Sequence, residues 1–217
     1  MSPDEIRQLI KANFPLAPVP SVPEIVLHRA APDSGFWRIA GVDENFGTPY
    51  WAYDWGGGLA LARFVLDHPE TVRGRRVLDL GAGSGIVAIA AAKSGARYVM
   101  AADVDRYAVA AIALNAEANS VAVSPFYGDL TIGAAPQVDI ILVGDLFYEK
   151  ALAEYVLEFL DRCRALNIDV LIGDPYRAFL PYRRLRLVAE YAGEDFGATQ
   201  TRNAVFALEG TRTGSSR

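Results

Sequence analysis

Three glycines at alternate positions follow a short apolar run that contains a single aspartate. Residues 77–85 have the sequence VLDLGAGSG, with Asp79 inside the run and Gly81, Gly83 and Gly85 after it. Glycine has no Cβ, so the backbone can turn tightly here and come close to a bound ligand. The segment therefore predicts a buried strand, a glycine turn and a helix that together bind a nucleotide-like cofactor.

The residues around the turn discriminate between cofactors of this kind. The dinucleotide fingerprint needs glycine or alanine three positions after the second glycine, where this chain has Ile86, and no GK[ST] sequence of a P-loop follows. A carboxylate at Asp79 would repel a pyrophosphate, but it would attract the ammonium and the sulfonium of S-adenosylmethionine. The sequence therefore favours S-adenosylmethionine over a nicotinamide dinucleotide.

Further polar residues follow the next two predicted strands. Asp103 closes the segment YVMAAD, and a carboxylate at this distance from the glycines can accept hydrogen bonds from both ribose hydroxyls. Asp105 is expected to cap the next helix. Asp129 lies where an adenine amino group needs an acceptor, and Leu130 beside it can pack on the base. A turn aspartate without a ligand is the alternative for Asp129.

The segment VGDLFYE, residues 143–149, ends the fourth strand predicted within the sheet and could perform the chemistry. Methyl transfer from a sulfonium requires an aligned neutral nucleophile and the exclusion of water, because the leaving group needs no assistance. Asp145 and Glu149 would attract a lysine ammonium and receive its proton. Tyr148 would line the channel for the lysine stem. Alternatively, these residues only end the strand and cap the next helix.

Two other segments supply candidate groups. Trp55 precedes three glycines, and its indole could cover the adenosine or lie next to the sulfonium. Asp174 and Arg177 belong to the segment GDPYR after the next strand, where Arg177 could pair with Asp174 or with an acid of the substrate. The same segment resembles the [DN]PP[YF] element of amino-directed nucleic-acid methyltransferases, but it lacks the second proline.

The elements that must position these residues alternate along the chain. From residue 58, helical and strand segments alternate, which predicts a doubly wound parallel sheet. Two final strand segments, 184–191 and 203–209, predict an antiparallel hairpin. This gives an α/β fold with seven strands, the class I or Rossmann-like methyltransferase arrangement, whose strand ends place the candidate residues along one crevice.

We expect three parts: an N-terminal cap extension over residues 1–57, a single methyltransferase unit over 58–210 and a disordered tail over 211–217. The cap is predicted to contain a helix that begins after Ser2. Four prolines between residues 15 and 23 should break the chain after that helix. Residues 24–29 and 36–40 are candidate strands.

Composition limits the class of partner. The net charge of −5 and the pI near 5.1 disfavour a nucleic-acid partner. We expect no membrane span, because no apolar run reaches about 18 residues. We expect no metal site, because the two histidines lie far apart in the sequence. The single cysteine and the absence of a visible targeting segment favour a cytoplasmic protein, which we expect to be a monomer.

Five segments taken together resemble the electron transfer flavoprotein β-subunit lysine methyltransferase family, which belongs to the family 16 group of seven-strand methyltransferases. The glycine segment alone is generic, whereas PYWAYDW combined with DLFYE and GDPYR is more specific. The likeness covers residues 47–208, through segments 47–69, 75–96, 101–119, 143–149 and 170–177.

This resemblance implies S-adenosylmethionine as the cofactor and methylation of lysine side chains in a folded protein. It identifies the residues 145–149 with the family's signature after the fourth strand. It also suggests the flavoprotein's β subunit as the substrate, with a ribosomal protein as a second target. Alternatives are methylation of a small-molecule amine or a nucleic acid, a cofactor-binding module without catalysis, and a nicotinamide oxidoreductase.

Overall fold

The computed structural model describes residues 1–30, 46–195 and 198–209. The α-helices are α1 (Pro3–Asn13), α3 (Gly56–Asp67), α4 (Ile86–Lys93), α5 (Arg106–Ala118) and α6 (Lys150–Ala165). The strands are β1 (Leu16–Val19), β2 (Val22–His28), β3 (Arg76–Leu80), β4 (Tyr98–Asp103), β5 (Ser124–Tyr127), β6 (Ile140–Gly144), β7 (Asp169–Asp174), β8 (Leu185–Asp195) and β9 (Ala198–Leu208). Short 3-10 helices are η1 (Tyr50–Ala52), η2 (Pro69–Thr71), η3 (Leu130–Ile132) and η4 (Tyr182–Arg184).

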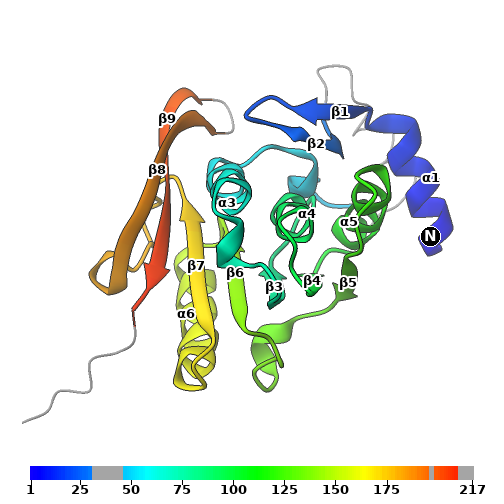
Figure 1. Cartoon of the computed structure of the whole chain (residues 1–217). Coiled ribbons are helices and arrows are strands. Elements are labelled where there is room, and N and C mark those ends of the chain that lie inside the picture. The colour runs from blue at the N-terminus through cyan, green and yellow to red at the C-terminus, as the bar shows by residue number, and fades with distance from the viewer. Residues whose placement is uncertain (31–45, 196–197, 210–217) are drawn as a thin grey trace, which may run out of the picture.

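A seven-stranded sheet forms the centre of the molecule, in the order β5-β4-β3-β6-β7-β9-β8 (Figure 1). The first five strands in this order pair in parallel, and β9 and β8 are antiparallel to their neighbours. This confirms the predicted fold. The hairpin strands are longer than predicted, because residues assigned to the connection continue the ladder from Ala192 to Asp195.

Helices cover the two faces of the sheet unequally. The helices α3, α4 and α5 lie side by side on one face, and α6 lies on the other (Figure 1). Alternate residues of β3 serve the two layers: Val77 packs with the three-helix layer, whereas Leu78 and Leu80 pack with the α6 layer. Asp79 therefore faces the three-helix layer, where α4 begins.

The N-terminal cap packs against α5. The predicted helix is confirmed as α1, with a capping box in which Ser2 accepts from the backbone of Glu5. Ile6 and Ile10 of α1 are buried in a cluster that includes Tyr107 of α5. The cap therefore rests on a helix whose other side faces the sheet.

The helix ends before the prolines, as predicted, but the sequence did not predict that the residues after Pro15 form a strand. Residues 16–19 form β1, which pairs antiparallel with β2 and has a register shift next to Pro18. Proline lacks an N–H, but an edge strand tolerates it at such an irregularity. The predicted strand over residues 24–29 is confirmed by β2. The predicted strand over residues 36–40 and the predicted tail lie outside the described residues.

The start of α3 lies directly against the backbone of β7. A Cβ added to Gly57 would overlap the carbonyl of Gly173, and a Cβ on Gly173 would overlap the carbonyl of Gly57. Glycine is therefore required at both positions so that α3 and β7 can touch.

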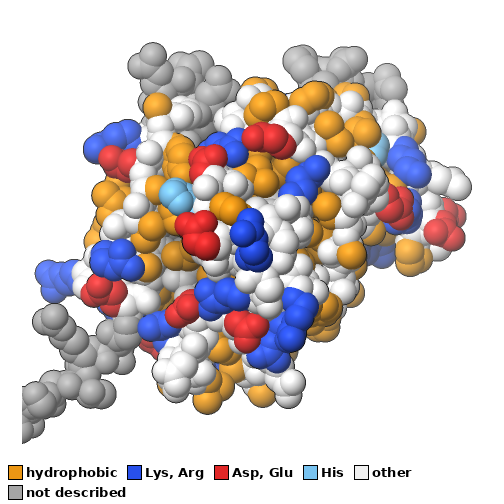
Figure 2. Space-filling model, viewed as in Figure 1, with side chains coloured by type: hydrophobic (Ala, Val, Ile, Leu, Met, Phe, Trp, Pro, Cys, Tyr) orange, Lys and Arg blue, Asp and Glu red, His pale blue; other side chains and the backbone are white. Residues whose placement is uncertain are grey.

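Charges on the surface are mixed rather than separated. Basic and acidic side chains lie next to one another on the face shown in Figure 2. Several of them form ion pairs, such as Arg76 with Asp139 and Arg75 with Asp169. Within the described residues, no helix combines the length and the apolar character that a bilayer span requires.

Candidate active site

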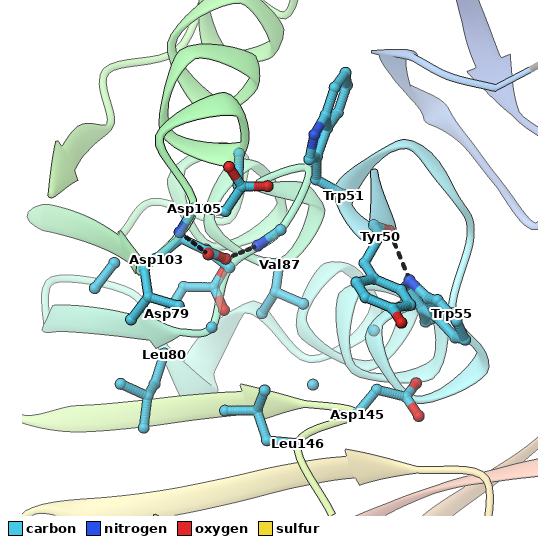
Figure 3. Close-up of a pocket in the computed structure, with 18 of the residues that line it drawn as sticks. Tyr50, Trp51, Trp55, Asp79, Leu80, Val87, Asp103, Asp105, Asp145 and Leu146 are labelled. Atoms are coloured by element: carbon cyan, nitrogen blue, oxygen red, sulfur yellow. Dashed lines mark hydrogen bonds between the residues drawn. The ribbon is translucent and has the colours of Figure 1, made fainter. Parts of the chain in front are cut away.

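A cavity of about 450 Å³ opens at the carboxyl edge of the parallel strands (Figure 3). It is bordered by the ends of β3, β4 and β6 and by residues around η1. Nine of the predicted site residues line it: Trp55, Asp79, Gly81, Gly83, Asp103, Asp129, Leu130, Asp145 and Tyr148. The structure thus brings together residues that are up to 93 positions apart in the sequence. Their roles stay predictions.

Two predicted residues are not among those that border the cavity. Gly85 is the N-cap of α4 in the left-handed conformation, and a Cβ at this position would press against Ile112. Glu149 is exposed and occupies the N-cap position of α6. Gly85 therefore serves the packing of helix α4, and Glu149 lies beside the cavity mouth rather than in its wall.

Asp103 holds the glycine turn through its carboxylate. Its Oδ2 accepts a hydrogen bond from the Gly83 N–H at 2.8 Å, and its Oδ1 accepts one from the Asp105 N–H at 2.9 Å (Figure 3). Burial raises the pKa of the Asp103 carboxyl, against the lowering effect of these N–H groups. Each oxygen can still accept a further hydrogen bond from a hydroxyl group. The predicted cap of α5 by Asp105 is confirmed.

Asp79 is fully buried beneath the first turn of α4. Its carboxylate accepts a hydrogen bond from the Ala88 N–H at 2.9 Å. Burial and, to a smaller extent, the neighbouring carboxylate of Asp103 raise its pKa to about 7, against the lowering effect of the N–H group. A cationic ligand in the cavity would favour the ionised form of Asp79. We call Asp79, Asp103 and the turn at Gly81 and Gly83 the glycine-turn end.

Asp129 caps η3 and also lines the cavity. Its Oδ1 accepts hydrogen bonds from the backbone N–H of Thr131 at 2.8 Å and from the Thr131 hydroxyl at 2.6 Å. The turn role of Asp129 is therefore confirmed, and its second carboxylate oxygen could still accept a hydrogen bond from a ligand amino group. Leu130 lies beside it in the cavity wall.

Asp145 lies at the other end of the cavity, paired with an arginine. Its Oδ1 forms an ion pair with Nε of Arg177 at 2.8 Å, and its Oδ2 accepts from the Gly57 N–H at 2.5 Å. Its backbone is left-handed, with φ of +57°. Burial raises the pKa of its carboxyl, although Arg177 opposes this. We call Asp145 and Arg177 the Arg177 end.

Sequence reasoning missed one member of this cluster, Asp195. Its carboxylate pairs with Nη2 of Arg177 at 3.2 Å and accepts from the Gly56 N–H at 3.1 Å. Asp174 was predicted as a possible partner, but it accepts from the backbone N–H of Arg177, at 2.6 Å, and burial raises its pKa to about 7. Asp195 arrives from β8, so only the hairpin geometry reveals it.

Aromatic residues form the wall between the two ends. The indole Nε1 of Trp55 donates to the Tyr50 carbonyl at 2.8 Å (Figure 3). The guanidinium of Arg177 lies over the Trp55 ring, 5.7 Å from its centroid. Tyr148 lies at the mouth, and partial burial and the nearby Glu149 raise its pKa. These side chains give the cavity an apolar side facing its acidic one.

Two asparagines, Asn115 in α5 and Asn119 at its C-cap, connect this helix to the cap, and Asn115 also bonds the glycine turn. Asn115 is fully buried: it accepts from the His28 N–H at 2.8 Å and donates to the Ser84 carbonyl in the glycine turn at 2.8 Å. Asn119, one turn later, bonds both backbone groups of Val26. Their spacing along one helix face was the available signal.

The cavity is strongly acidic. Among the described residues that line it are six aspartates and a single basic side chain, that of Arg177. A ligand with positive charge is favoured there, and a diphosphate is disfavoured. The arrangement can hold a cationic, hydroxyl-bearing ligand at the glycine-turn end and receive a second cation at the Arg177 end.

Comparisons with known proteins agree with this geometry. Residues 61–162 match the family model described as ribosomal protein L11 methyltransferase (PrmA). The electron transfer flavoprotein beta subunit lysine methyltransferase of Xenopus laevis is 43% identical over 182 residues, which cover 81% of this chain and 74% of that protein. The Homo sapiens protein of the same name is 39% identical over 176 residues, or 80% and 67% of the two chains.

Solved structures share the fold at low identity. A ribosomal protein L11 methylase from Lactobacillus delbrueckii subsp. bulgaricus superimposes with a TM-score of 0.52 and 22% identity, covering 69% of this chain and 77% of that one. A Pyrococcus abyssi tRNA (uracil-54, C5)-methyltransferase, solved with S-adenosyl-L-homocysteine, gives a TM-score of 0.51 and 20% identity, covering 70% and 38%. At this identity the likeness concerns the fold alone.

Proposed function

The chain belongs to the electron transfer flavoprotein beta subunit lysine methyltransferase family, and we propose that its acceptor is a lysine of that β subunit. Membership and fold make it a protein-lysine methyltransferase that uses S-adenosylmethionine. The observation that carries the proposed acceptor is the 43% identity to the Xenopus laevis relative across 81% of this chain. The acidic cavity supports a cationic acceptor.

The residues at the glycine-turn end fit S-adenosylmethionine by the chemistry of their donor and acceptor groups. Asp79 supplies a buried carboxylate for the ammonium of the methionine part, and Asp103 supplies acceptors for the ribose hydroxyls. Asp129 and Leu130 supply an acceptor and an apolar surface for the adenine. Trp55 closes the cavity on the opposite side. We propose these residues, with Gly81 and Gly83, as the cofactor site.

S-adenosylmethionine, when bound, supplies an electrophilic methyl group on a positively charged sulfur. The protein must present the lysine nitrogen in its neutral form and keep water away from it. We propose that Asp145 and Glu149 attract the lysine as an ammonium, and that its proton passes to a carboxylate before transfer. Tyr148, at the mouth, lies where it can guide the aliphatic stem into the cavity.

Arg177 changes the expected role of Asp145. Both carboxylate oxygens of Asp145 are already engaged, one by Arg177 and one by the Gly57 N–H. An incoming lysine must therefore share Asp145 with Arg177 instead of meeting an unpaired carboxylate. The arginine keeps this carboxylate ionised and in position, while the exposed Glu149 remains available for the first encounter with the lysine.

The match to the ribosomal protein L11 methyltransferase model supports a second candidate acceptor, a ribosomal protein. The matched segment, 61–162, covers the cofactor side of the cavity and the residues 145–149. It does not include the cap residues 50–55 or Arg177. The flavoprotein subunit is therefore the acceptor that more of the cavity supports.

Transfer of label from radioactive S-adenosylmethionine tests the proposed function. The enzyme is incubated with purified electron transfer flavoprotein and, separately, with a lysate of cells that lack the enzyme. We expect label on lysines of the β subunit, assigned by mass spectrometry. Label on nucleic acid or on small molecules alone would refute the proposal, and label on a ribosomal protein alone would favour the second acceptor.

A further inference from the structure

Apolar side chains that are exposed to solvent surround the mouth of the cavity. Tyr50, Val104, Tyr148 and Tyr155 all line the cavity, and they are 62%, 66%, 55% and 39% exposed. They come from η1, from the turns after β4 and β6, and from α6. Because all four border the same cavity, they form one rim rather than scattered surface residues.

The rim continues on both sides of the mouth, beyond the residues that line the cavity. Ile132 in η3, which follows β5, is 75% exposed, and Tyr127 at the end of β5 is 62% exposed. Phe179, which follows β7 and lies two residues after the cavity-lining Arg177, is also exposed. The strands β5 and β7 flank β4, β3 and β6 in the sheet, and their carboxyl ends share one edge.

Exposed apolar side chains are concentrated around the cavity mouth. Fourteen large apolar side chains are exposed in the described part of the chain; four of them line the cavity, and Tyr127, Ile132 and Phe179 lie within two residues of others that line it. Single exposed apolar side chains are ordinary, but a group of them around one opening indicates a surface that another molecule covers. Tyrosine is also enriched in protein interfaces, because its ring packs while its hydroxyl remains hydrated.

Charge defines the partner that fits this surface. The rim is apolar, whereas the cavity inside it is lined by six aspartates and Arg177. The complementary surface is therefore a positive side chain that projects from an apolar patch. A polyanion would meet the acidic cavity unfavourably, and a strongly basic surface would leave the rim uncovered.

We propose that this rim docks the protein substrate, through apolar side chains that surround the target lysine on the substrate's folded surface. The inference rests on the proposed function, because it assumes a protein-lysine acceptor. Rim contacts hold the substrate surface, and the acidic cavity receives only the lysine. Substrate choice would then depend on the apolar neighbours of the lysine as well as on the lysine itself.

The double variant Ile132→Ser, Phe179→Ser tests the docking surface. Neither residue lines the cavity; Ile132 follows β5 and Phe179 follows β7, the strands on either side of the three that border it. We expect the KM for the labelled protein acceptor to rise about tenfold. The kcat at saturation and the Kd for S-adenosylmethionine should stay within a factor of about two, because the catalytic and cofactor residues are unchanged.

The matched control is Leu166→Ser, Leu187→Ser, which removes similar exposed apolar side chains at the end of α6 and on the edge strand β8. This control should leave the KM unchanged. An unchanged KM in the rim variant, or an equal rise of the KM in the control, would refute the proposed docking surface. In either case, label on a lysine of the protein acceptor would still support the proposed function. A wild-type enzyme that labels no protein would refute both.

Discussion

Aspartates line both ends of the cavity, but different partners hold them. At the glycine-turn end, Asp79 and Asp103 accept hydrogen bonds from backbone N–H groups, at 2.8 to 2.9 Å. At the Arg177 end, Asp145 has a guanidinium at 2.8 Å in addition to a backbone N–H. The carboxylates of the first end therefore bond uncharged N–H groups, whereas part of the charge at the second end is balanced by Arg177.

This difference matches the two tasks that we propose. A cofactor that stays through the reaction benefits from a rigid carboxylate set whose positions backbone groups fix. An acceptor lysine must enter, lose a proton and leave with its methyl group. A carboxylate already shared with Arg177 attracts the lysine less strongly than an unpaired one would. The Arg177 end thus favours turnover over tight retention of the acceptor.

The largest expected effect comes from removing the charge of Asp145. Asp145→Asn keeps an acceptor for the Gly57 N–H but loses the ion pair with Arg177. We expect kcat to fall about 100-fold, because the group that receives the lysine loses its negative charge. Cofactor affinity, measured by calorimetry, should change by no more than about threefold.

Asp195→Asn is the matched control for this variant. Asp195 also pairs with Arg177 and accepts from a glycine N–H at the start of α3, yet it is not among the residues that line the cavity. Its kcat should fall by no more than about threefold. Equal losses in the two variants would show that Asp145 acts only by holding Arg177 and the start of α3.

The burial of Asp79 should lower the stability of the ligand-free protein as the pH rises. Its pKa is about 7 in the folded state and 3.8 in the unfolded state. Between these two pH values the folded protein binds one more proton than the unfolded protein does. The stabilisation that comes from the protonated Asp79 carboxyl is therefore complete below pH 4 and is lost as the pH rises through 7.

Asp79→Asn should therefore unfold less readily than the wild type at pH 8 in urea. The difference in pKa, which already includes the effect of the hydrogen bond from the Ala88 N–H, corresponds to about 4 kcal/mol. The free energy of unfolding at pH 8 should therefore rise by up to about 4 kcal/mol. The gain should vanish at pH 4, and a variant that is equally destabilised at both pH values would contradict this account.

The same carboxylate should make cofactor binding depend on pH. The ammonium of the cofactor pairs with ionised Asp79, and ionisation increases as the pH approaches 7. Between pH 5.5 and pH 7 the affinity for S-adenosylmethionine should rise about tenfold, below the range in which an α-ammonium loses its proton. In Asp79→Asn, binding should be weaker at pH 7, and its dependence on pH in this range should be lost.

The smallest expected effect concerns the link between the cap and the glycine turn. Asn115→Leu removes the hydrogen bonds to His28 and Ser84, whereas Asn119→Leu removes those to Val26. Both variants should melt at lower temperature. Only Asn115→Leu should raise the Kd for the cofactor, by about threefold, because only Asn115 contacts the turn. An equal Kd in the two variants would reduce Asn115 to a packing role.

Much of the fold followed from local patterns. Alternating helical and strand segments predicted the parallel sheet, and the acidic and apolar residues after Ser2 predicted α1. The strand β1 was missed because proline normally interrupts a ladder, and only pairing with β2 at the edge of the small sheet makes it acceptable. Local propensity cannot register a partner that lies further along the chain.

The sequence by itself determined the glycine turn and the aspartates that end successive strands, because a strand's end and the residue type there are local properties. Tertiary structure alone decided which groups meet. It placed Arg177 and Asp195 around Asp145, and it set Gly57 against Gly173. These contacts join α3, the end of β6, the turn after β7 and the end of β8. These segments are far apart in the sequence, and only the folded sheet brings them together at one edge.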